Sequence, residues 1–319
     1  SRSSARGREH HPPQLTVARG HTPLPSGSVA VSLRRWVSAA ARAYDRIRPP
    51  APGVVVLIYH RVGGGTASAV DMPVDEFDAQ MEVLAAGTTV LTLDEAVTAL
   101  AAGQQREGVV ITFDDGTDFD WRDLPHPAHG PQRSLYNCLA DFRGAAPRPR
   151  EAHATAFVVV SRATREHIDR VGLANLGWWT DSWWAAAAAS GLAAIASHSW
   201  DHNHEQAEHL MGRRRATGTF RSIDGYELAE EEIARATAHL RRVVPNPGDR
   251  LFAYPYGESN DYLVRDYFPR NHVRIGVDAA FGDGARPMAG GDDRWNLPRF
   301  VCGRDWSSPR EFESMLATT

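Results

Sequence analysis

From Val54 to the end of the chain, short apolar runs alternate with segments in which apolar residues recur at a helical spacing. Alternation of this kind is typical of parallel β/α units. The apolar runs are 54–59, 88–93, 109–113, 154–160, 192–197, 251–255, 275–281 and 297–302, and helical patterns lie between them at 75–86, 94–102, 183–191 and 227–243. Seven or eight such units in one domain favour a distorted parallel (β/α)7–8 barrel over an open sheet, so we expect an α/β barrel fold.

The first 52 residues differ in composition from the rest of the chain. Residues 1–27 are rich in Ser, Arg, His, Pro and Gly, and we expect a disordered tail there. Residues 28–52 are expected to form an N-terminal helix and a proline-rich linker, because apolar side chains recur at a helical spacing as far as Ile47. We expect this extension to pack on the main domain; a membrane-surface helix is the alternative. Residues 53–319 are predicted to form one domain with an insertion at 117–150.

The charge balance narrows the range of partners. The net charge is −4, and all 35 basic residues are arginines. Nine of these arginines lie in the first 50 residues against only Glu9 and Asp45, so the rest of the chain is strongly acidic. An acidic main domain argues against nucleic acid as a partner.

Hydropathy and cysteine usage give weaker indications about the compartment. No stretch approaches the roughly 18 apolar residues of a transmembrane helix, so no membrane-spanning segment is expected. No signal-peptide core is visible near the N-terminus, which favours a cytoplasmic location, although a leader could have been removed and the compartment stays open. The only cysteines, Cys138 and Cys302, are expected to be two buried thiols, with a single disulfide as the alternative.

Two polar motifs directly follow apolar runs. Asp114 and Asp115 end the run at 109–113, and His198 and His202 follow the run at 192–197. One carboxylate and two imidazoles make a three-ligand site for a borderline divalent metal, and the other carboxylate is left beside that metal as a base. An isolated Asp-Asp-Gly is more often a turn, and an isolated His is more often a core residue. The combination, however, predicts a metal-dependent hydrolase.

The expected barrel would bring further polar residues to the same place. In β/α barrels the chemistry lies at the carboxyl ends of the strands. Asp114, His198, Tyr256 and His60 all lie just past apolar runs. We therefore expect these side chains to converge on one rim.

Four segments together resemble a known family. Thr112–Gly116 reads Thr-Phe-Asp-Asp-Gly, His198–His202 reads His-Ser-x-x-His, and Tyr254–Gly257 reads Tyr-Pro-Tyr-Gly. These segments are similar to motifs of the polysaccharide deacetylases of carbohydrate esterase family 4, the NodB-homology enzymes. Leu57–Val62 resembles the opening strand of the branch that includes poly-N-acetylglucosamine deacetylases. The resemblance spans roughly residues 54–305.

The resemblance implies a role for each matching residue. Asp114 would be the catalytic base, and Asp115, His198 and His202 would bind a divalent metal, Zn²⁺ first and Co²⁺, Ni²⁺ or Fe²⁺ as alternatives. The main-chain N–H of Tyr256 would help to hold the oxyanion. The implied reaction is attack of metal-bound water on the acetamide carbonyl of an N-acetylated sugar or glycan, which yields acetate and a free amine.

Two positions depart from the family pattern. Many members carry an arginine, paired with the base, where this chain has Ala253, and Arg299 could supply that charge from a neighbouring strand. The family's general acid is a late histidine, whereas this chain has no histidine after Arg299. His60 is the leading replacement, because closing a barrel places the first and last strands side by side, although it could also be purely structural. The weaker candidates for the acid are His126 and His129.

The sequence does not identify the substrate, so three functions remain open. Sugars stack on indole faces, so one of the clustered residues Trp178, Trp179, Trp183 and Trp184 could line a saccharide site, although tryptophan is also a common core residue. The alternative activity is hydrolysis of an amide or imide in a small metabolite, which a closed pocket under the insertion would suit. A non-catalytic carbohydrate-binding module is the third possibility. The sequence leaves the oligomeric state open.

Overall fold

The computed structural model describes residues 53–63, 71–144, 152–172, 175–207, 217–245 and 247–319. The expected tail at 1–27 and helix with linker at 28–52 lie outside these residues and stay predictions. Among the described residues we find no helix with the length and hydropathy of a transmembrane span.

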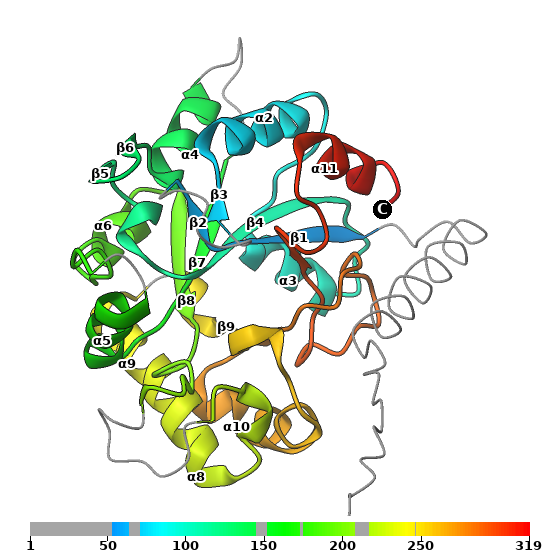
Figure 1. Ribbon diagram of the computed structural model, residues 1–319. Helices are drawn as coiled ribbons and strands as arrows, with labels where there is room; N and C mark the ends of the chain where they lie inside the picture. Colours follow the sequence, from blue (N-terminus) through cyan, green and yellow to red (C-terminus); the bar gives the residue numbers. More distant parts are fainter. Residues whose placement is uncertain (1–52, 64–70, 145–151, 173–174, 208–216, 246) are drawn as a thin grey trace, which may run out of the picture. The chain divides into compact units, whose positions relative to one another are not determined.

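Seven parallel strands form one curled sheet with helices outside it (Figure 1). The order across the sheet is β10-β9-β8-β7-β4-β1-β11. The strands are β1 Val54–Tyr59, β4 Gly108–Asp115, β7 Ala154–Val158, β8 Ala193–Ser197, β9 Leu251–Ala253, β10 Ala279–Phe281 and β11 Phe300–Val301. The predicted distorted parallel α/β barrel is therefore confirmed.

One short segment closes the barrel. Leu297 bridges to Phe281 of β10, and three residues later Phe300 pairs with Leu57 of β1. The Leu297 N–H donates to the Ala280 carbonyl at 2.9 Å. The last strand therefore lies beside the first, as barrel closure requires.

The expected strand at 88–93 is wrong in its extent. Val90 makes a single parallel bridge to Val109, and the chain then enters helix α3, Leu93–Ala101. A capping box begins this helix, because Thr92 Oγ1 accepts from the Glu95 N–H at 3.1 Å while the Glu95 carboxylate accepts from the Thr92 N–H at 2.9 Å. The capped helix start therefore ends the extended run after one bridge.

Helices and short elements surround the sheet (Figure 1). The other helices are α2 Val74–Ala85, α4 Leu135–Gly144, α5 Arg162–Gly172, α6 Trp184–Ala189, α8 Tyr226–Ala229, α9 Arg235–Val243, α10 Phe268–Ile275 and α11 Pro309–Leu316. The short strands are β2 Arg61–Val62, β3 Asp71–Met72, β5 Leu124–His126 and β6 Gly130–Gln132. Of the insertion expected at 117–150, the described part holds a 3-10 turn at Asp118–Asp120, the β5–β6 hairpin and α4. Helix α4 packs against α2.

Successive side chains of a strand point to opposite faces of the sheet, so the core is divided between its two sides. Val109, Ile111 and Phe113 of β4 belong to a large apolar cluster that also contains side chains of α2 and α4. Val110 belongs to a second cluster made from facing residues of several strands, which fills the barrel interior. Asp114 lies at an even position of the same strand, so the pleat directs it toward this interior. Cys138 and Cys302 are both buried and unpaired, which confirms the preferred interpretation of the cysteines.

Candidate metal centre and active site

The carboxyl end of β4 separates the two adjacent aspartates. Asp114 is buried, at 4% exposure, whereas Asp115 is partly open and has a left-handed backbone with φ 76°. Gly116 follows with φ 74°, and a Cβ there would lie 2.4 Å from Val158 Cγ1. Only glycine fits this position, because its backbone is left-handed and Val158 leaves no room for a Cβ atom.

Asp114 makes a buried, two-pronged ion pair with Arg299. Arg299 Nη1 donates to Asp114 Oδ1 at 2.8 Å and Nη2 donates to Oδ2 at 2.9 Å. Arg299 lies in the segment that closes the barrel, is itself fully buried, and also donates through Nε to the Gly282 carbonyl at 3.1 Å. Burial by itself raises the pKa of Asp114, but the charge and the hydrogen bonds of Arg299 outweigh it, so the pKa lies below its usual value. This carboxylate is therefore ionised at neutral pH, and Arg299 places a positive charge beside it although position 253 is alanine.

The two histidines lie on a tight loop after β8. Ser199, His202 and Asn203 have left-handed backbones, with φ 70°, 64° and 43°. Each such conformation costs a non-glycine residue about 1–2 kcal/mol, so surrounding contacts must hold the loop. Ser199 Oγ accepts from the His202 N–H at 2.9 Å, and Val160 N–H donates to the Ser199 carbonyl at 3.1 Å.

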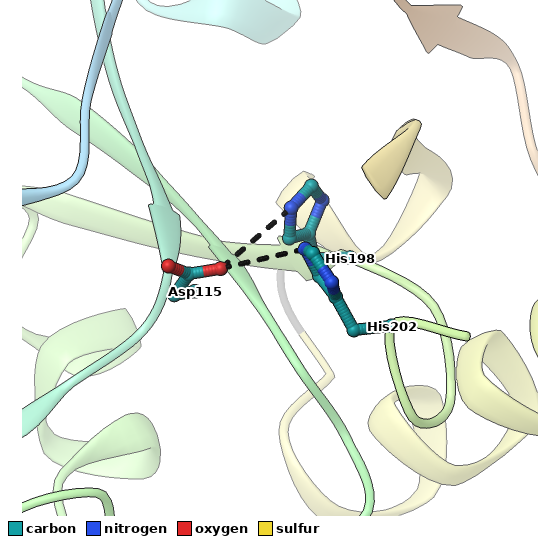
Figure 2. Close-up of side chains that lie close together, drawn as sticks. All are labelled: Asp115, His198 and His202. Atoms are coloured by element: carbon teal, nitrogen blue, oxygen red, sulfur yellow. Dashed lines mark ion pairs between the residues drawn. The ribbon is translucent and has the colours of Figure 1, made fainter. Parts of the chain in front are cut away.

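Asp115, His198 and His202 gather their donor atoms into one cluster (Figure 2). Asp115 Oδ1 lies 3.9 Å from His198 Nε2 and 3.7 Å from His202 Nε2. The donor atoms around a tetrahedral zinc ion at the usual bond lengths are about 3.4 Å apart. The three side chains would therefore need to move only a few tenths of an ångström closer to bind such an ion.

The protonation states of the imidazoles suit a metal. His198 Nδ1 lies 3.0 Å from the Ala253 carbonyl, a contact that holds the proton on Nδ1 and leaves the lone pair on Nε2 toward Asp115. Burial lowers the pKa of His198, and burial followed by the neighbouring His198 lowers the pKa of His202 to about 3. Both rings are therefore neutral at neutral pH. One carboxylate and two neutral imidazoles fit a divalent cation.

Tyr256 stands at the mouth of this cluster. It occupies a 3-10 turn, Pro255–Gly257, with a left-handed backbone at φ 59° and 42% exposure. Its ring meets the His202 ring edge-on, with centroids 4.4 Å apart. Burial, and then the charge of Asp115, raise the pKa of the Tyr256 hydroxyl, which therefore stays protonated. The structure thus brings Tyr256 to the candidate metal ligands, while its oxyanion role remains a prediction.

The candidate acids lie in different places. His60 directly follows β1, and it is close enough to Asp114 to contribute to the low pKa of that carboxyl. Its Nδ1 is buried and has no hydrogen-bond partner within the described residues. His126 and His129 instead contact each other on the β5–β6 hairpin, with ring centroids 4.5 Å apart.

The tryptophan cluster is mostly structural. Trp179, Trp183 and Trp184 are buried, and Trp179 Nε1 donates to the Asp115 carbonyl at 3.0 Å, which helps to fix the ligand's backbone. Buried indoles cannot stack on a sugar from solvent. Trp178 is half-buried and its ring centroid lies 6.0 Å from that of His126, so it stays available as a saccharide contact.

Sequence reasoning missed a buried carboxylate near the metal cluster. Asp120 is 1% exposed, and neither of its carboxylate oxygens has a hydrogen-bond partner among the residues described. Burial and then the charge of Asp115 raise the pKa of Asp120 well above its usual value. Its position within the insertion gave no signal, because burial is not visible in an irregular polar segment.

Comparisons with known proteins identify a matching family and similar structures. The model of a family described as polysaccharide deacetylase matches residues 102–268. The chain is similar to IcaB from Ammonifex degensii, with 25% identity, a TM-score of 0.54 and coverage of 84% of this chain and 98% of that one. No curated protein matches the chain.

Two more distant structures share the fold. The Streptococcus pyogenes deacetylase PplD, solved in complex with acetate, has 16% identity, a TM-score of 0.55 and coverage of 84% of this chain and 99% of that one. The BpsB deacetylase domain from Bordetella bronchiseptica has 15% identity, a TM-score of 0.52 and coverage of 79% and 98%.

Proposed function

Because the chain belongs to the polysaccharide deacetylase family, we propose that it removes acetyl groups from an N-acetylated sugar or glycan by metal-dependent hydrolysis of the amide bond. The observation that carries this proposal is the pairing of two features at one end of the sheet. A buried, ionised Asp114 held by Arg299 lies beside the donor cluster of Asp115, His198 and His202. The first supplies a base and the second a metal site.

Asp115, His198 and His202 are the residues that would hold the cation, and Zn²⁺ matches their donor set best. A divalent cation bound there would act as a Lewis acid on the amide carbonyl and would lower the pKa of water. His198 Nε2 lies 3.9 Å from both Asp114 and Asp115, so base and ligands share one small site. This proximity is what general-base attack on a carbonyl requires.

We assign the proton transfers to residues of this chain. Asp114 accepts a proton as water oxygen bonds to the carbonyl carbon, and Arg299 keeps Asp114 ionised until then. The main-chain N–H of Tyr256 donates to the oxygen that gains negative charge. The carbon–nitrogen bond then breaks, His60 gives a proton to the leaving nitrogen, and acetate and a free amine result. The lack of a hydrogen-bond partner for His60 Nδ1 within the described residues supports its availability for this step.

Release of acetate from oligomers of N-acetylglucosamine by the zinc-loaded chain tests the proposal. Asp114→Asn should lower kcat by about 10²–10⁴-fold while zinc content stays the same, because a base is lost and no ligand is removed. The matched control is Asp141→Asn, which changes an exposed carboxylate on α4 and should leave kcat unchanged. Undiminished acetate release by Asp114→Asn would contradict the base assignment. If the chain releases acetate from no N-acetylated glycan but hydrolyses small amides, its substrates are small amides.

A comparison of two histidine variants tests whether His60 gives the proton to the leaving nitrogen. His60→Gln should lower kcat about 10²-fold without loss of zinc, whereas His126→Gln should leave kcat within a factor of two to three. A large loss for His126→Gln with none for His60→Gln would reverse the assignment.

A further inference from the structure

A π-helical turn interrupts the long helical segment that follows residue 225. Helix α8 passes into a π-helix at Glu230–Ala234 and then into α9. The Arg235 N–H donates to the Glu230 carbonyl, a bond that spans five residues where an α-helix spans four. Turns of this kind are rare and are frequently found at functional sites. This one therefore calls for a physical explanation.

The turn presents Glu232 to the loop that carries the two histidines. Glu232 is completely buried, with 0% exposure. Its main-chain carbonyl accepts from the Trp200 N–H at 2.8 Å, and its carboxylate Oε2 accepts from the Asp201 N–H at 3.2 Å. One residue therefore holds two successive N–H groups of the loop. A carboxylate is costly to bury without such partners.

The two residues whose N–H groups bind Glu232 lie between the two candidate metal ligands. Trp200 and Asp201 are the second and third residues after His198, and His202 comes next with its left-handed φ of 64°. A backbone of this shape persists only where neighbouring contacts determine it. The same helical segment adds a second contact, because the Arg235 guanidinium lies 3.6 Å from the centroid of the Trp200 ring.

We propose that Glu232 is a positioning residue of the metal centre, which fixes the backbone at Trp200 and Asp201 so that His202 points toward Asp115 and His198. The inference rests on the proposed metal-dependent function. Nothing in the scheme requires Glu232 to touch the metal or the substrate. It acts through the geometry of the loop, as residues that orient metal ligands do in other proteins.

Titration of the metal-free, full-length chain with Co²⁺, followed by its visible absorption, tests the proposal. Glu232→Ala should weaken Co²⁺ binding about 10–100-fold, the usual effect of removing a group that orients ligands. Glu232→Gln keeps an acceptor oxygen at the same reach and should restore most of the affinity. The matched control is Glu227→Ala, because Glu227 lies on helix α8 of the same helical segment and is exposed. The control should bind Co²⁺ like the parent chain.

Thermal unfolding of each metal-free variant separates positioning from general stability. Glu232→Asp, which shortens the side chain by one methylene group, provides a second variant if Glu232→Ala fails to fold. At saturating Co²⁺, the kcat of a weakened variant should recover, since no reacting group is lost. Parent-like Co²⁺ affinity in folded Glu232→Ala or Glu232→Asp would overturn the proposal, as would failure of both variants to fold. If the parent chain binds no Co²⁺, the proposed function itself fails, which is a different outcome.

Discussion

Replacing Arg299 with glutamine should destabilise the protein and move the acid limb of its pH–activity profile. Arg299 and Asp114 are joined by hydrogen bonds of 2.8 and 2.9 Å, and the two side chains are 0% and 5% exposed. Removing one partner of a buried ion pair costs about 3–5 kcal/mol, because the other charge is left uncompensated. Glutamine can keep one hydrogen bond, so we expect about 3 kcal/mol at neutral pH.

The same substitution has a consequence for the base. Without Arg299, burial becomes the dominant influence and raises the pKa of Asp114. Asp114 would then stay protonated to higher pH, so the acid limb of kcat/KM should move toward neutral pH. The loss of stability should be smaller at acid pH, where the carboxyl is neutral.

Urea unfolding of the metal-free variants and kcat/KM against pH at saturating metal provide the measurements. The double variant Asp114→Asn/Arg299→Gln removes both charges and should be more stable than Arg299→Gln alone. Arg304→Gln is the control, because Arg304 pairs with Asp283 at the surface and its loss should cost less than about 1 kcal/mol. If Arg299→Gln costs no more than Arg304→Gln and the acid limb stays in place, Arg299 does not keep Asp114 ionised.

Two further predictions concern the same rim. Between pH 7 and 5 the metal-free protein should lose about 2 kcal/mol of stability through His202 alone, because its folded pKa of about 3 lies below the unfolded value, so the unfolded chain binds more protons. Urea unfolding of His202→Asn should show a decline smaller by that amount, and an equal decline would contradict it. Gly116→Ala should lower the free energy of unfolding by about 3 kcal/mol, because the new Cβ atom would collide with Val158. Gly130→Ala should cost only about 1 kcal/mol, because Gly130 has a similar φ but open space around it. Equal losses in urea unfolding would show that the contact with Val158 does not matter.

Much of the fold follows from hydrophobic periodicity. The alternation of apolar runs with helical patterns predicted the parallel barrel, and closure of a barrel predicted that the last strand lies beside the first. The position of Arg299, close to Asp114 across β1, depends on that closure. The expected strand at 88–93 failed because a capping box at Thr92 starts a helix inside an apolar run. Local capping there outweighed the run's hydrophobicity.

The contacts that hold the candidate metal ligands in place could not be predicted in the same way. Glu232 lies in a segment of three successive glutamates, and only the π turn determines which of them is buried. A change of one residue in helical phase is invisible to an analysis that assumes a constant period. Trp179 was expected as a possible sugar contact, but its indole donates to the Asp115 backbone. Both features depend on contacts between segments distant in the sequence.

The proposed function requires that Asp115, His198 and His202 hold one divalent cation beside Asp114. Anomalous diffraction at the zinc edge, from crystals of the chain grown with Zn²⁺, locates such an ion. We expect a peak about 2.0–2.2 Å from an Asp115 carboxylate oxygen, His198 Nε2 and His202 Nε2. If there is no peak at this position, or if zinc is bound only by other residues, these three side chains do not form the metal site.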